Sequence, residues 1–152
     1  MLLEIPGLKF LTSNIREMIM TYQLSPQEFE STLAQDAEQR YHHFLQQAVL
    51  HNEVWILKDD EGCVSLSTDD EECIPVWPHP DYAKAWAGDD FAACEPYAVP
   101  LKTWLDRWVK GMSEDGVAVA VFPLADADGV VEDPATMADD LLRKMAKLNR
   151  KK

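Results

Sequence analysis

The sequence is poor in the patterns that mark enzymes and cofactor sites. Its six glycines are scattered, so neither a GxGxxG dinucleotide loop nor a phosphate-binding P-loop occurs. It has no GxSxG turn, and no serine or cysteine belongs to a recognisable nucleophile signature. Because no set of nucleophile, base and oxyanion donor can be assembled, we expect a protein that is not an enzyme, with no catalytic residue and no cofactor.

Cysteine and long apolar runs are also scarce. Cys63, Cys73 and Cys94 are an odd number without CxxC spacing, which is typical of a reducing cytoplasm rather than of a disulfide framework. Their spacing to His51 and His79 does not match a zinc finger, so we predict no metal site. No stretch approaches the roughly 20 apolar residues that span a bilayer. We therefore expect a cytoplasmic protein.

Positive charge is scarce as well. The chain has 14 Lys and Arg against 27 Asp and Glu, for a net charge of −13. Such a charge argues against a nucleic-acid or membrane partner and favours a basic protein partner. Six of the basic residues follow the last acidic residue, Asp140, in the final ten positions. We interpret these six basic residues as the C-terminal end of a helix, where positive charge complements the helix dipole, rather than as a contact with nucleic acid.

Helical patterns dominate the chain before residue 53. Ser25-Pro26-Gln27-Glu28 is a helix start, with serine as the cap and proline at the first helical position. A second helix is expected to begin after Asp36 and to end near residues 51–52. Its apolar stripe has three- and four-residue steps and consists of Ala37, Tyr41, Phe44, Leu45, Ala48 and Val49.

Short apolar runs between turn residues predict strands in the rest of the chain. They lie at 54–57, 63–66, 74–77, 94–99 and 117–122. Pro75 cannot donate to a ladder, so its strand either lies at an edge or pairs on one side there. The six apolar residues 117–122 are typical of a central strand covered on both faces.

Helices separate the later strands. A short helix is expected over 81–87, a longer one from Pro100 to Met112, and a last one after Pro134. The residues of the last helix that should point inward are Ala138, Leu141, Leu142, Met145 and Leu148. The order predicts an α+β fold, a mainly antiparallel or mixed sheet of about five strands with helices packed against it.

The domain boundaries follow from the same patterns. Met20 lies a few residues upstream of the first clear helix start and is a candidate natural start codon. We interpret residues 1–19 as an N-terminal extension, either non-native or a docked helix. Residues 20–148 form a single α+β domain, and residues 149–152 form a basic tail.

The corner Trp77-Pro78-His79-Pro80-Asp81 is the most unusual local pattern. An aromatic ring, an imidazole and a carboxylate beside two prolines are suited to a binding rim, so Trp77, His79 and Asp81 are the candidate binding residues. The simpler alternative is structural, with the prolines fixing the exit of the strand and Asp81 capping the next helix.

One further pattern resembles a metal site. Asp126-x-Asp128-Gly129 matches the middle of a calcium loop, but Leu124 and Ala135 occupy the positions of the first and twelfth ligands. We therefore interpret this segment as a turn.

Three segments carry a resemblance to a known family. They are Val54–Asp59, Pro75–Pro80, and Trp104-Leu105 running into 115–123, and they resemble the bacterial family called Domain of Unknown Function 2750. The resemblance covers about residues 36–145 and implies a small acidic domain without an established activity. A looser likeness in layout links the chain to the N-terminal domain of enhanced-serine-sensitivity protein B and to bacterial toxin-immunity proteins.

Two functional hypotheses follow. The first is a non-enzymatic interaction protein that binds a basic or apolar partner through an acidic surface, toxin neutralisation being one form of this role. The second is a small-molecule or peptide-binding domain with the Trp77–Asp81 corner at its rim. The chain also has five tryptophans, and one or two of them could form an exposed aromatic patch. Such a patch would bind another protein or a second copy of the chain in a homodimer.

Overall fold

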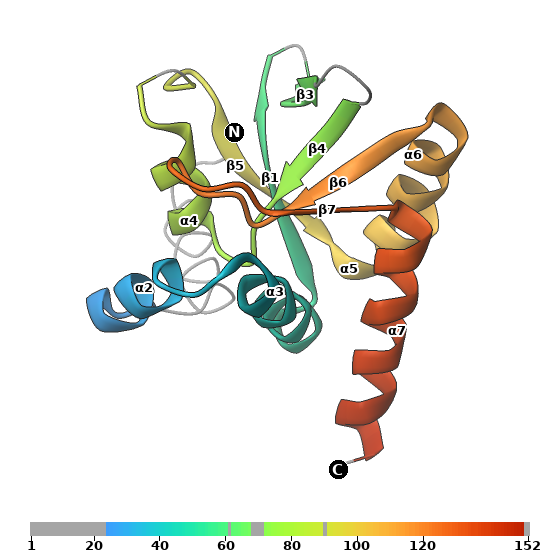
Figure 1. Cartoon of the computed structure of the whole chain (residues 1–152). Helices are drawn as coiled ribbons and strands as arrows, with labels where there is room; N and C mark the ends of the chain where they lie inside the picture. Colours follow the sequence, from blue (N-terminus) through green and yellow to red (C-terminus); the bar gives the residue numbers. More distant parts are fainter. Residues whose placement is uncertain (1–23, 61, 68–71, 90, 151–152) are drawn as a thin grey trace, which may run out of the picture.

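The computed structural model describes residues 24–60, 62–67, 72–89 and 91–150 (Figure 1). The expectations for residues 1–19 and for Met20 lie outside these ranges. The strands form two small sheets. In the view of Figure 1, α3 (Ala37–His51) lies below them, α4 (Pro80–Ala87) at the left, and α6 (Val109–Asp115) and α7 (Pro134–Arg150) at the right. The α+β class is confirmed. The described residues form seven strands in two sheets, however, and not one sheet of about five.

The N-terminal helices begin where their caps predict. The Ser25 hydroxyl accepts a hydrogen bond from the backbone N–H of Glu28 at the start of α2 (Pro26–Leu33). Asp36 and Gln39 form a reciprocal capping box at the start of α3 (Ala37–His51). Asn52 ends α3 in the left-handed conformation, with a φ of 58°.

The first sheet is antiparallel and has β1 (Glu53–Asp59) at its centre, between β2 (Gly62–Cys63) and β5 (Glu95–Pro100). The expected single strand over 63–66 is wrong. Cys63 pairs with β1, whereas Leu66 belongs to β3 (Leu66–Ser67) and pairs with the second sheet. The chain therefore crosses between the sheets within this segment.

The second sheet has the order β3-β4-β6-β7. Its strands β4 (Glu72–Val76) and β6 (Val117–Val121) are parallel, and β7 (Val130–Glu132) is antiparallel to β6. The ladder between β3 and β4 ends before Pro75, so β4 pairs only with β6 at that residue. This is the one-sided pairing that the proline requires.

The central position of β6 is confirmed by its neighbours and by its burial. Val119 and Val121 lie in the main hydrophobic core. Ala118 and Ala120 point to the opposite face, where they meet Cys73 in a second buried cluster. Side chains on both faces are therefore removed from water, as the unbroken apolar run predicts.

Helices α4 (Pro80–Ala87), α5 (Leu101–Thr103), α6 (Val109–Asp115) and α7 (Pro134–Arg150) complete the fold. The expected helix from Pro100 is present, but a π-helical segment (Trp104–Trp108) joins α5 to α6 and stacks its two tryptophan rings 5.6 Å apart. None of the helices in the described ranges has the length and apolar composition needed to cross a membrane.

One prediction for α7 is wrong. Leu142 is 50% exposed, whereas Met137, which was not expected inside, is fully buried. Met137 and Leu141 are four residues apart and so share one face of the helix, which points to the core. Leu142 lies one residue further round the helix and projects outward.

Candidate functional site

Trp77 joins the two sheets at the corner that the sequence singles out. Its backbone exchanges two hydrogen bonds with Trp55 of β1, at 3.0 and 2.9 Å. Its indole N–H donates to the carbonyl oxygen of Pro123 at 3.0 Å, and its ring lies 5.3 Å from that of Trp86. The side chain is fully buried, so Trp77 is a structural anchor in this conformation.

His79 caps the helix that follows the corner. Its Nδ1 accepts a hydrogen bond from the backbone N–H of Asp81 at 3.1 Å, and Pro80 occupies the first turn of α4. With Nδ1 as the acceptor, the neutral imidazole carries its proton on Nε2. Only 4% of His79 is exposed. The corner is therefore closed at His79.

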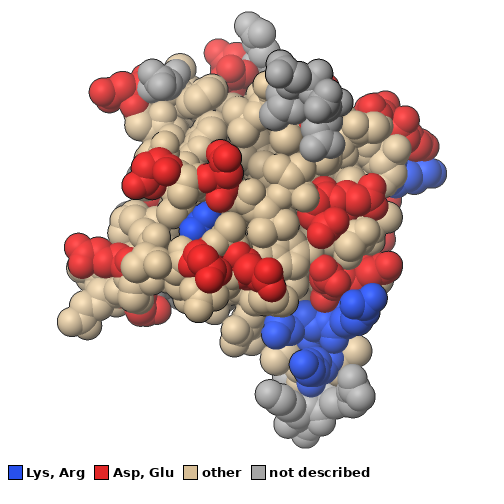
Figure 2. Space-filling model, viewed as in Figure 1, with Lys and Arg blue, Asp and Glu red and all other residues tan. Residues whose placement is uncertain are grey.

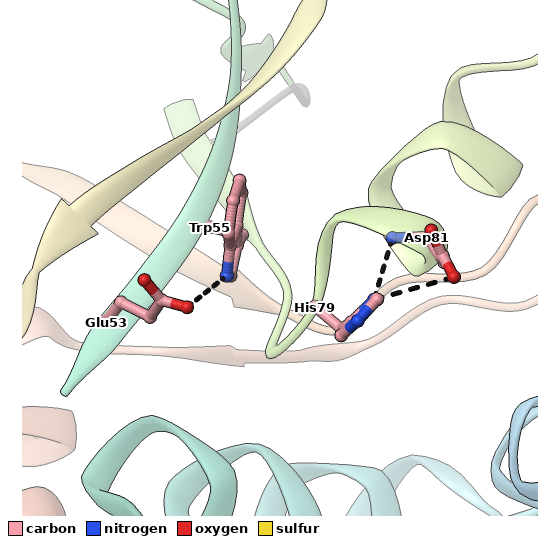
Figure 3. Close-up of polar contacts among 4 residues, drawn as sticks. All are labelled: Glu53, Trp55, His79 and Asp81. Carbon is pink, nitrogen blue, oxygen red and sulfur yellow. Dashed lines mark hydrogen bonds and ion pairs between the residues drawn. The ribbon is translucent and has the colours of Figure 1, made fainter. Parts of the chain in front are cut away.

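Asp81 lies inside the first turn of α4 and not at its cap. The expectation that Asp81 caps the helix is wrong, because the side chain of His79 provides the cap. The Asp81 carboxylate lies 3.8 Å from Nδ1 of His79 and is exposed (Figure 3). Its negative charge complements the helix dipole. Of the three candidate residues, Asp81 alone is accessible, and a binding role for the corner stays a prediction.

Two titratable residues near the corner were not singled out from the sequence as a site. Glu53 at the start of β1 accepts a hydrogen bond from the indole N–H of Trp55 at 3.2 Å (Figure 3). Burial raises the pKa of Glu53 and outweighs the lowering effect of that bond. Burial also lowers the pKa of His51 at the end of α3, and its electrostatic interaction with the His79 side chain lowers it further. The contact of Glu53 with Trp55 is local, since the two residues are neighbours on one face of β1. His51 and His79 come from separate elements, so no local pattern indicates that pair.

Four carboxylates lie near Arg40 and Tyr41, two adjacent buried residues of α3. The charges of Asp36 and Asp126 act on Arg40, whose pKa is nonetheless lowered by burial. Tyr41 donates a hydrogen bond to Asp140 at 2.5 Å. Burial, this bond and the charges of Asp140 and Glu132 all raise the pKa of Tyr41.

We name Asp36, Asp126, Glu132 and Asp140 the acidic face. Asp36 and Asp126 are exposed, and Glu132 and Asp140 are half-buried. Figure 2 shows carboxylates spread over this side of the molecule, and basic groups gathered on the second half of α7. The acidic face combines α3, the loop after β6, β7 and α7, so it arises only in the folded chain.

Arg40 holds the loop that carries Asp126. Its guanidinium donates to the carbonyl oxygens of Gln35 at 2.6 Å, Asp128 at 3.0 Å and Phe122 at 3.1 Å. Only 2% of the residue is exposed. The loop is a turn, as predicted, and the Asp128 carbonyl is directed to this cation. Sequence reasoning missed Arg40, because an arginine beside an apolar stripe usually points to water.

Among the described residues, no three His, Cys, Asp or Glu side chains are placed to hold a metal ion. Cys63, Cys73 and Cys94, all within the described ranges, form no disulfide. Burial raises the pKa of Cys63 and of Cys94, which disfavours the reactive thiolate form of both.

Fold and site define a small α+β domain with two sheets, a closed proline-flanked corner and an acidic face. The model of one family, the proteins of unknown function DUF2750, matches residues 41–141. This range runs from α3 to α7 and includes both sheets and the corner. The chain therefore belongs to the DUF2750 family. Comparison with curated proteins and with solved structures found no match.

Proposed function

We propose that this protein is a non-enzymatic interaction domain of the bacterial cytoplasm, and that its acidic face binds a basic protein partner. The observation that carries the proposal is the convergence of Asp36, Asp126, Glu132 and Asp140 around α3. Of the cations near this face, Arg40 is buried and bonded to carbonyl oxygens, and Arg143 pairs with Asp140 at its edge, at 3.3 Å. Neutralisation of a basic toxin is one form of this role.

The strength of exposed ion pairs implies that several carboxylates of the acidic face together recognise the partner. A single exposed ion pair contributes about 0.2–1 kcal/mol, so one carboxylate would not define a partner. Several like charges on one face speed the approach of an oppositely charged protein and exclude acidic competitors. The odd number of cysteines without CxxC spacing favours a reducing compartment.

Quantitative capture from a bacterial lysate tests the proposal. The bait proteins are the parent chain and the variant Asp36→Asn/Asp126→Asn/Glu132→Gln, which removes three charges and keeps the side-chain sizes. Asparagine also serves as a helix cap, so α3 keeps its start. A basic partner is expected to be enriched on the parent at least about threefold over the variant, since three ion pairs near the surface contribute about 0.6–3 kcal/mol.

The matched control is Asp89→Asn/Glu95→Gln/Glu114→Gln, which removes three exposed charges elsewhere on the surface. It should retain the partner as the parent does. The partner should also elute as salt rises, because interactions between exposed charges are screened. If the partner stays on the acidic-face variant, or resists salt, the proposal is wrong.

A groove beside the corner favours the second candidate function, the binding of a small molecule or peptide. The groove has a volume of about 360 Å³ and lies against α4, the helix that His79 caps. Its lining is mainly apolar and consists of Leu33, Tyr82, Ala85, Trp86, Leu124, Ala125 and Asp126. This size lies in the lower part of the range for ligand pockets, which is about 300–1,000 Å³.

A thermal-shift screen separates this candidate from the first. A ligand present at 100 times its Kd stabilises a protein by about 2.7 kcal/mol, which gives a clear rise in Tm. We expect such a ligand to stabilise the parent and not Ala85→Trp, which fills the groove. Lys84→Trp adds the same bulk one residue away, outside the lining, and should respond like the parent. If every stabilising compound acts equally on all three proteins, the groove is not the site.

A further inference from the structure

A groove of about 390 Å³ runs between α3 and the second half of α7. One wall presents the cations Arg143, Lys144 and Lys147, and His42 faces them from α3. Leu45 and Ala146 add apolar surface to the lining. A groove lined by basic and apolar side chains is unusual in a chain whose net charge is −13.

The ends of this groove differ in charge. Asp140, a member of the acidic face, lies at one end, where it accepts a hydrogen bond from the Tyr41 hydroxyl and pairs with Arg143 at 3.3 Å. Beyond it, α7 carries only basic charge, and Figure 2 shows these basic groups gathered on one surface. A helix dipole explains cations near the end of a helix, but it does not explain why a second helix should form a hollow beside them.

We propose that this groove binds a small anionic amphiphile, that is, a carboxylate or phosphate head with a short apolar tail. The head pairs with Lys144 and Lys147, and the tail covers Leu45 and Ala146. Leu45 is only 4% exposed and lies at the base of the groove, so the exposed Ala146 supplies most of the apolar contact. The volume lies near the lower end of the usual pocket range and limits the ligand to a short tail.

The charge of the whole protein makes the apolar contact necessary. A net charge of −13 repels anions at long range, so a simple anion gains little from the local cations. An apolar tail adds stabilisation that does not depend on charge, about 0.8 kcal/mol for each buried CH₂ group. An anion with a tail should therefore bind, and the bare anion should not.

Amide NMR titrations of the labelled protein test this proposal with four probes: octanoate, octyl phosphate, inorganic phosphate and octylammonium. Octanoate or octyl phosphate should shift the signals of His42, Leu45 and Ala146, and the stronger of the two identifies the head group. Inorganic phosphate and octylammonium should leave these signals unchanged. Lys144→Gln/Lys147→Gln should raise the Kd about tenfold, because charge-assisted hydrogen bonds contribute about 1.5–3 kcal/mol each and exposure reduces this.

Two variants complete the test. Lys84→Gln/Lys110→Gln removes two exposed charges from α4 and α6 and should change the Kd less than twofold. Ala146→Glu places a carboxylate at the groove and should abolish binding of the anionic probes. The proposal fails if octylammonium binds as well as octanoate, if Lys144→Gln/Lys147→Gln binds like the parent, or if phosphate alone binds as tightly as octyl phosphate.

Discussion

Replacing Gly129 with alanine is expected to lower the free energy of unfolding by about 3 kcal/mol or more, the upper part of the range for overpacked sites. A Cβ atom at this position would lie 2.2 Å from the carbonyl oxygen of Val121 and 2.9 Å from the nitrogen of Pro123. Both are backbone atoms at the end of β6, next to the pair Val121–Val130 that joins β6 to β7. They cannot move away without disturbing that pairing.

Urea unfolding measures this effect, and Gly111→Ala is the matched control. Gly111 lies within α6, and a Cβ atom there would meet nothing within 4 Å. Alanine should stabilise that helix by up to about 1 kcal/mol. Equal unfolding midpoints for the two variants would show that the turn before β7 is not closely packed on β6.

Replacing Arg40 with methionine is expected to cost about 3–5 kcal/mol of stability. The substitution leaves the carbonyl oxygens of Gln35, Phe122 and Asp128 without their donor, and an unsatisfied buried polar group costs about 1–3 kcal/mol. Phe122 also has a φ of 56°, a left-handed conformation that costs about 1–2 kcal/mol. Arg40 is one of the contacts that hold it there.

Two further variants identify the cause of this loss. Arg40→Lys keeps the charge but lacks the planar fork that reaches three acceptors, so its stability should be intermediate. Arg107→Met removes an exposed arginine and should change stability by less than about 0.5 kcal/mol. If Arg40→Lys is as stable as the parent in urea unfolding, charge alone holds the loop and the three hydrogen bonds are not needed.

The sequence predicted those parts of the fold that depend on local rules. Ser25 and Asp36 mark helix starts because their side chains cap nearby N–H groups. The unbroken apolar run of β6 marks its central place because both faces must be buried. The sequence did not predict that the strand is interrupted between Cys63 and Leu66. The interruption depends on the folded arrangement, in which Cys63 pairs with the first sheet and Leu66 pairs with the second.

The candidate site was less predictable. The pattern at Trp77 and His79 is unusual in sequence, but whether such a corner lies open or closed depends on Trp55 and Pro123, which are distant along the chain. The acidic face was expected only as a property of composition. Its position follows from the loop that Arg40 holds against α3, and no local pattern indicates a buried arginine bonded across more than 80 residues.

The most direct test of the acidic face is amide NMR mapping with a short arginine-rich peptide as the basic probe. The largest shifts are expected at residues 36–41, at 126–128 and at Glu132, and they should disappear as salt rises. Equal shifts at the exposed acids Asp89, Glu95 and Glu114, or larger shifts there, would contradict the proposal that the acidic face is the binding surface of this protein.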